Sequence, residues 1–517
     1  MTSQEPSSPR RTPRPARLGR WAIVAWFCVL LGLPLVLFMA GVRPPQIEKR
    51  RPAEAPGAFF ASSLLDTDWW GQIADWYTDR LPGRDLGVEA NAWVDLHLLG
   101  DSPDPRVILG TEDWLYLRDA VSVACVDEGG IRRAVDQVAL AERVLAAAGK
   151  RLVLVVAPNK AAIYPEHLGD AADDTGCADA NRAAFRSMIG AGGVVGFVDA
   201  WAVLGRAKDT LPGLLYHRLD THWTSLGAAQ VGEAVVESLA PDLWDPAALT
   251  FIRSSERRGD LTVLIGLPLT EMAEYWQVER AVRPRVTSQP LGAGAKAVTS
   301  RLQGIPTIGA TGLMLHDSTG FALARVLRPY FGTLTTVRFR ENVSSFGAGA
   351  SWFAERLRAA DVLILVSVER EVLDRLHGGL AAELVGALAD TLPSREIRLA
   401  PGMAGAGSGV RWVPATEELV TTGDALPALA LPDLEAAAGG DRYLVVEMAP
   451  DHRTEVRLTW QAPGGRPEEL VRTVSPSDTV LVMGLPAEEP LTGMVLQPGS
   501  GEGHRVLAIS VVDIPAG

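Results

Sequence analysis

Short, uninterrupted aliphatic runs alternate with helix-like stretches through the middle of this 517-residue chain. The aliphatic runs are residues 152–156, 313–315, 335–339 and 362–368, and helical apolar spacing occurs at 131–150, 321–331 and 351–359. Strands that are aliphatic on both faces are typical of a mostly parallel sheet covered by helices on each side. The pattern predicts an α/β fold, in which ligands bind beyond the carboxyl ends of the strands.

The C-terminal part has a different residue composition and hydrophobic pattern. Residues 401–409 are dominated by Gly, Ala and Ser and show no amphipathic pattern, which is typical of a linker. Short apolar or alternating runs follow, at 443–448, 455–460, 479–483 and 506–512, and this spacing predicts an antiparallel β-sandwich. We therefore expect an α/β domain over 59–400 and a β-sandwich over 410–517, which resembles carbohydrate-binding modules in architecture.

The N-terminal part contains an uncharged run at residues 21–42. About 22 residues at about 1.5 Å each are enough for a helix to cross a hydrocarbon core. Five arginines precede the run within residues 1–20, so the positive-inside rule predicts a cytoplasmic basic tail, a transmembrane anchor at 21–42 and an extracytoplasmic remainder. Residues 43–58 read as a spacer. The alternative is a cleaved signal peptide, which the length of the run and the poor cleavage site at Phe38 and Ala40 disfavour.

Charge and cysteine content narrow the function classes. The net charge of −13 makes nucleic acid a poor partner. Cys28 lies inside the predicted anchor, whereas Cys125 and Cys177 would meet an oxidising compartment, so we expect these two to form a disulfide. Neither the number nor the spacing of the cysteines suggests a zinc site.

The first candidate catalytic residues are Asp220 and His222, just before a helix-like apolar stripe. A carboxylate two residues from an imidazole can hold one ring nitrogen, so that the other nitrogen acts as a base. The alternative is a structural hydrogen-bonding or capping motif.

The second candidate is Ser318, in a polar turn between a predicted strand and a predicted helix. A helix N-terminus favours a developing negative charge, and a serine placed there becomes nucleophilic when a base lies nearby. His222 is the candidate base. The alternative is that Ser318 only caps the helix.

These motifs, taken in chain order, resemble the SGNH hydrolase-like family of alginate and cell-wall polysaccharide O-acetyltransferases. The landmarks that carry the resemblance span about residues 105–375 and are Trp-Leu-Tyr-Leu at 114–117, Val-Ala-Pro-Asn-Lys at 156–160, Ile-Tyr-Pro at 163–165, Asp-Thr-His-Trp at 220–223, Gly-Asp-Leu at 259–261, Asp-Ser at 317–318 and Glu-Arg at 369–370.

The resemblance implies that Ser318 is the acyl-accepting nucleophile, His222 the general base and acid, and Asp220 the residue that orients His222. It also implies a circularly permuted motif order, because the Asp/His block here precedes the serine block. Geometry rather than order defines such a triad.

Other residues are candidates for the oxyanion site or for substrate binding. Arg370 corresponds by strand order to the family's oxyanion-binding Asn, with an ion pair to Glu369 as the alternative. His316 replaces the Gly that ordinary SGNH proteins have before Asp-Ser. Asn159 ends another strand, and Trp223 either stacks on a sugar ring or packs in the core. Lys160, next to Asn159 at the end of the same strand, is expected at a solvated edge, with a position facing the site as the alternative. His217 is expected at the surface.

The predicted function is an extracytoplasmic O-acyltransferase, with acetyl as the expected group, that modifies hydroxyls of an exported polysaccharide without a metal or diffusible cofactor. The resemblance further implies a membrane-bound protein that donates the acyl group. Two alternatives stay open: a polysaccharide acetylesterase that uses the same residues, and a non-catalytic membrane-tethered scaffold of an export complex.

Overall fold

A computed structural model describes residues 17–42, 53–292, 295–338, 350–376, 379–404, 408–423, 425–437, 439–462 and 464–516. It divides into two units, one made of Met1–Leu109 with Arg258–Thr270 and the other of Gly110–Arg257 with Glu271–Gly517. The predicted basic tail up to residue 16 and the predicted spacer from 43 to 52 lie outside the described residues.

The first unit is helical. Its α-helices are α1 (Arg17–Met39), α2 (Thr67–Thr78), α3 (Arg84–Val94) and α10 (Asp260–Leu264). The uncharged run at 21–42 falls mainly on α1, where Trp21, Phe27 and Val36 are exposed. Of the helices in the described ranges, none combines the length and apolar content that a bilayer crossing requires, so the predicted transmembrane anchor is not confirmed.

The second unit contains the predicted parallel sheet. In the described part of the chain this sheet has seven strands, in the spatial order β4 (Phe197–Val198), β3 (Arg151–Ala157), β11 (Val362–Val368), β9 (Ile308–His316), β10 (Phe331–Arg338), β8 (Ala295–Arg301) and β7 (Arg285–Gly292). The strands from β4 to β10 pair in parallel, and β8 and β7 add antiparallel at one edge. The expectation of an α/β fold with a mostly parallel sheet is therefore confirmed, with an antiparallel edge that the sequence did not reveal.

Helices cover both faces of this sheet. Buried side chains of α5 (Glu128–Ala147), α7 (Gly176–Ala191), α12 (Ala350–Ala359) and α14 (Leu380–Leu388) share one hydrophobic core with alternate residues of the central strands. Contacts to β3, β4 and β9 come from α8 (Ala200–Thr210), α9 (Ser225–Leu239) and α11 (Gly320–Leu327). Because neighbouring strand residues point to opposite faces, each aliphatic run contributes to both layers.

The C-terminal part forms two antiparallel sheets around a core of their own. In the described ranges, one sheet contains β12 (Ser394–Glu396), β13 (Val410–Val413), β14 (Glu418–Thr422), β16 (Asp441–Ala449), β19 (Val480–Leu485) and β21 (Glu502–Ile514), and the other contains β15 (Leu429–Ala430), β17 (Thr454–Gln461), β18 (Pro467–Val474) and β20 (Thr492–Gln497). Strand β12 pairs with β21, so this sheet takes in a strand that precedes the Gly- and Ala-rich segment 401–409.

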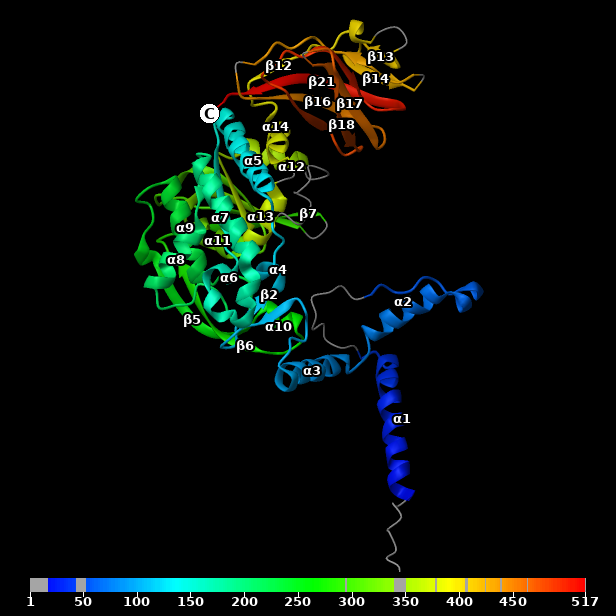
Figure 1. Ribbon diagram of the computed structural model, residues 1–517, viewed down its shortest axis with the longest axis vertical. Helices are drawn as coiled ribbons and strands as arrows, with labels where there is room; N and C mark the ends of the chain where they lie inside the picture. The colour runs from blue at the N-terminus through cyan, green and yellow to red at the C-terminus, as the bar shows by residue number, and fades with distance from the viewer. Residues whose placement is uncertain are drawn as a thin grey trace, which may run out of the picture. The chain divides into compact units, whose positions relative to one another are not determined.

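The first of these sheets also packs against the α/β part. Tyr443, Val445, Val512 and Ile514 belong to the same hydrophobic core as α5 and α14. The Arg143 guanidinium on α5 adds an ion pair, with its Nη2 2.6 Å from Asp441 Oδ2 on β16. Figure 1 shows α5 and α14 beside this sheet.

Candidate active site

The hairpin that carries Asp220 and His222 precedes α9. An antiparallel bridge joins Tyr216 to Trp223, and the backbone N–H of Thr224 donates to the Leu215 carbonyl at 2.8 Å. Thr224 then caps α9, because its Oγ1 accepts from the Gly227 N–H at 3.1 Å. The hairpin is therefore fixed at its base by both a bridge and a helix cap.

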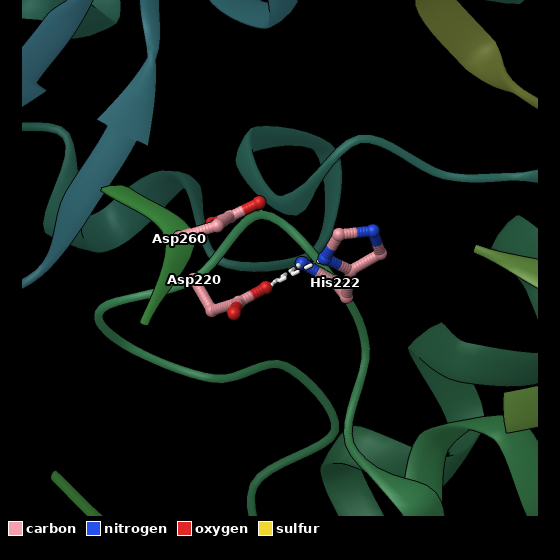
Figure 2. A group of neighbouring side chains, drawn as sticks. All are labelled: Asp220, His222 and Asp260. Carbon is pink, nitrogen blue, oxygen red and sulfur yellow. Dashed lines mark hydrogen bonds and ion pairs between the residues drawn. The ribbon is translucent and has the colours of Figure 1, made fainter. Parts of the chain in front are cut away.

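Asp220 and His222 are directly hydrogen bonded (Figure 2). Asp220 Oδ1 lies 2.6 Å from His222 Nδ1, and the same oxygen accepts from the His222 backbone N–H at 2.9 Å. An ionised carboxylate can only accept, so Nδ1 carries the proton and Nε2 is left as the acceptor. This is the tautomer that a general base requires.

Arg257 holds the other oxygen of the Asp220 carboxylate. Its Nη2 donates to Asp220 Oδ2 at 2.7 Å from the end of β5 (Leu249–Arg258). Burial acts to raise the pKa of Asp220, but the hydrogen bonds from His222 and the charge of Arg257 outweigh it and hold that pKa well below its usual range. Nothing in the local sequence predicts this role for Arg257, apart from its place just before the Gly259 landmark.

Lys160 stabilises the same hairpin through its buried ammonium group. Its side chain is 4% exposed, and its Nζ donates to the carbonyl oxygens of His217, Arg218 and Asp220 at 3.0, 2.8 and 2.9 Å. The expectation of a solvated edge residue is therefore wrong. A buried ammonium needs such acceptors, and here the acceptors come from the hairpin that carries Asp220.

Ser318 lies in the turn between β9 and α11. The Asp317 carboxylate accepts from the backbone N–H groups of Thr319 at 2.8 Å and Val368 at 2.6 Å, which ties the turn to the end of β11. Gly320 is required where α11 begins, because a Cβ there would lie 2.3 Å from the His316 Cβ. Ser318 itself is partly exposed beside the N-terminus of α11.

The structure brings the hairpin and the serine turn together. Trp223 Nε1 donates to the Thr319 carbonyl oxygen at 3.0 Å, and these two residues directly follow His222 and Ser318. Trp223 is 2% exposed, so its ring is part of the core and is not available to stack on a sugar.

Arg370 and Asn159 meet at the ends of the neighbouring parallel strands β11 and β3. Arg370 Nη1 donates to Asn159 Oδ1 at 3.4 Å. Glu369 does not pair with Arg370 in the way the alternative expected; it accepts from Arg182 Nη1 at 3.0 Å and from Trp201 Nε1 at 3.1 Å. Burial raises the pKa of Glu369 in spite of the nearby Arg182 charge.

Two histidines are more buried than the sequence suggested. His316 is 2% exposed, and its Nδ1 lies 2.6 Å from the Asp317 carbonyl oxygen, so it is enclosed rather than open to a substrate. Burial lowers its pKa. His217 was expected at the surface, but burial, with the Arg257 charge, lowers its pKa to about 3.

Cys125 and Cys177, the pair named from the sequence, form a disulfide with their Cα atoms 4.7 Å apart. The bond joins the segment before α5 to the first turn of α7.

Comparison with known proteins identifies relatives of this fold. Residues 107–299 match the family model described as the SGNH hydrolase-like domain, acetyltransferase AlgX. The probable alginate O-acetylase AlgJ of Pseudomonas syringae pv. tomato is 30% identical over 215 residues, which cover 40% of this chain and 53% of that protein. The corresponding protein of Pseudomonas aeruginosa is 30% identical over 264 residues, which cover 49% of this chain and 62% of that protein.

Among solved structures, Pseudomonas aeruginosa AlgX is similar with a TM-score of 0.42 and 15% identity, covering 79% of this chain and 94% of that chain. By the two AlgJ alignments given above, this chain spans between half and two thirds of the length of each AlgJ relative. The resemblance to the SGNH hydrolase-like, alginate-type O-acetyltransferase family is confirmed, and residues 107–299 are the part of the chain that the family model matches.

Proposed function

We propose that this protein is an O-acyltransferase that transfers acetyl groups to hydroxyls of an exported polysaccharide, with Ser318 as nucleophile, His222 as general base and acid, and Asp220 as its orienting carboxylate. The observation that carries the proposal is the 2.6 Å contact between Asp220 Oδ1 and His222 Nδ1, on a hairpin bonded to the turn of Ser318 through Trp223 and Thr319. The names of the AlgJ relatives support the same reaction class.

In the first half-reaction, Ser318 Oγ attacks the carbonyl carbon of a donor ester while His222 Nε2 takes its proton. The tetrahedral intermediate collapses, the donor oxygen leaves with that proton, and the acetyl group stays on Ser318. In the second half-reaction a sugar hydroxyl attacks the acyl carbon, His222 takes the hydroxyl proton, and Ser318 Oγ leaves with it.

Charge on the intermediate needs donors at the same edge of the sheet. The N-terminal end of α11 carries a favourable dipole beside Ser318. Arg370 adds a guanidinium from the end of β11, held against Asn159. We assign Arg370 as an oxyanion donor within this proposal, with Asn159 as the residue that orients it.

The proposal places the site outside the cytoplasm, with the N-terminal segment as the membrane anchor and a separate membrane protein as the acyl donor. The arginines that precede the uncharged run support this orientation. The disulfide between Cys125 and Cys177 supports an oxidising compartment. In the same proposal the C-terminal β-sandwich recruits the polymer and residues 59–400 carry the chemistry.

The test uses the full chain, p-nitrophenyl acetate as donor, and a polysaccharide from the host as acceptor. We expect an acetyl adduct on Ser318 by mass spectrometry and acetylated polymer by NMR. Ser318→Ala should abolish both, whereas Ser238→Ala on α9 should leave both unchanged. Free acetate without acetylated polymer would favour an esterase, and no adduct on Ser318 would favour a scaffold.

A further inference from the structure

A small cavity lies beside the catalytic hairpin, between residues 212–217 and strand β6 (Thr270–Val278). Its volume is about 160 Å³, and the lining residues used below are Leu214, His217, Glu271, Met272, Glu274 and Trp276. A cavity of about 150 Å³ holds a bare six-membered ring such as benzene, so a pyranose ring would fit with its hydroxyl substituents partly outside. An apolar wall with a few placed polar groups is typical of a ligand site.

Trp276 forms the aromatic wall, and its orientation is fixed. Its Nε1 donates to Glu274 Oε2 at 3.2 Å, and its backbone N–H donates to Ser225 Oγ at 2.7 Å. The ring packs edge-on against Phe251 of β5 with centroids 5.5 Å apart. A held indole face is suited to the apolar face of a pyranose.

The polar wall contains a carboxylate that is only half satisfied. Glu271 is 4% exposed, and its Oε2 accepts from the Arg218 N–H at 2.8 Å. Within the described residues, its Oε1 is buried and has no hydrogen-bond partner. His217 Nδ1 lies 3.7 Å and Arg257 Nη1 lies 3.9 Å from this oxygen, both too far for a hydrogen bond. A buried unpaired oxygen is costly, and a hydroxyl donor from a ligand would satisfy it once the Glu271 side chain turns this oxygen toward the cavity.

The other polar group, His217, suits the same kind of ligand. Its lowered pKa keeps the imidazole neutral at neutral pH, so one ring nitrogen donates and the other accepts. Sugar hydroxyls also donate and accept. The His217 backbone N–H donates to the His222 carbonyl at 3.3 Å, so the cavity wall and the proposed base are opposite strands of one short hairpin.

The charge of the cavity lining favours uncharged sugars over uronates. The cavity is lined by the carboxylates of Glu271 and Glu274. Two cations act on Glu271, but both have other acceptors: Arg257 Nη2 donates to Asp220 Oδ2, and Lys160 Nζ donates to three backbone carbonyl oxygens. The whole chain carries a net charge of −13. A uronate ring would bring its own carboxylate against these groups, whereas an uncharged ring would not.

We propose that this cavity is a subsite for one uncharged sugar ring of the acceptor polysaccharide, with Trp276 as the stacking wall and Glu271 and His217 as the hydroxyl-binding groups. The inference rests on the proposed function for the identity of the ligand. It predicts that the acceptor polysaccharide of this chain contains uncharged sugars at this subsite rather than uronates.

The test is calorimetric titration of the full-length protein with three probes of equal length: a neutral manno-hexaose, a neutral gluco-hexaose and a hexamannuronate. We expect at least one neutral hexaose to bind at least tenfold more tightly than the hexamannuronate. Trp276→Leu should weaken that binding at least tenfold, whereas Trp93→Leu, at a half-exposed position on α3, should change it less than twofold. Glu274→Gln keeps an acceptor for the indole and should tighten hexamannuronate binding severalfold.

Met272→Arg provides a second variant if Trp276→Leu does not fold, because Met272 is 60% exposed at the rim. It should weaken neutral binding at least fivefold. Preferred binding of the hexamannuronate, no binding of any probe, or neutral binding unchanged in both variants would overturn the proposal. Ser318→Ala should bind the neutral probe as the natural protein does. If the natural protein binds a neutral hexaose but forms neither acetyl-Ser318 nor acetylated polymer, the proposed function fails and this subsite stands.

Discussion

Trp223 and Thr319, which follow the proposed base and the proposed nucleophile, are joined by a 3.0 Å hydrogen bond from the indole Nε1 to the carbonyl oxygen. Trp223→Phe keeps an aromatic ring but leaves that buried carbonyl without its donor. We expect a loss of about 2 kcal/mol in the free energy of unfolding and a fall of at least tenfold in kcat. The control is Trp244→Phe, which changes another buried Trp and should lower stability without lowering kcat. Equal losses of kcat in both variants would contradict the prediction.

Asp220→Asn should show whether Asp220 orients His222 or contributes to acceptor binding. An amide can hold His222 in the wrong tautomer, with Nε2 protonated, so we expect acetylation of Ser318 to fall by about 10³ to 10⁴ with little change in acceptor KM. Single-turnover kinetics with p-nitrophenyl acetate measures the rate. A loss confined to KM would show that Asp220 acts on binding instead.

Lys160 has a natural control elsewhere in the chain. Lys160→Met should destabilise the fold by about 2 to 4 kcal/mol and reduce acyl transfer at least a hundredfold, since it removes three bonds to the hairpin of Asp220. Lys150 Nζ donates to the carbonyls of Arg358 and Ala360 at 2.8 and 2.6 Å, away from the hairpin. Lys150→Met should lower stability but keep acyl-transfer activity. Thermal melts measure the stability of each variant and kcat measures its activity, and equal activity losses in both variants would contradict the prediction.

The stability of the fold should depend on the protonation of Glu383 in α14. Burial raises the pKa of Glu383 to about 8, from 4.5. The folded state therefore keeps a proton that the unfolded state releases, and stability falls as pH rises from about 4.5 to about 8. Glu383→Gln should stabilise the protein by about 2 to 4 kcal/mol at pH 8, after a discount for partial exposure, and by almost nothing at pH 4.5. Glu355→Gln, on exposed α12 surface, should have no such effect in urea titrations at both pH values.

The parts of the fold that sequence could predict are those with unambiguous local patterns. The run 362–368 is aliphatic on both faces and forms β11 with the same bounds. Strands β7 and β8 were missed because many of their side chains are polar and β7 ends with Pro290 and Gly292, so their pairing depends on the neighbouring β10.

The same contrast holds at the site. Asp220 and His222 are close in sequence, so their contact was foreseeable. Arg257 and Lys160 reach the hairpin from 37 and 60 residues away, and a lone basic residue carries no local signal of such a contact.

The hydrophobic core shared by Tyr443, Val445, α5 and α14 has a consequence for how the molecule melts. A tethered module would unfold in its own calorimetric transition, because few contacts would link it to the rest. Here the side chains of β16 and β21 fill the same interior as α5 and α14, so loss of the sandwich strands uncovers the α/β core. The two parts should therefore unfold as one cooperative unit, and a glycan bound to the sandwich would raise the melting temperature of the region that holds Ser318.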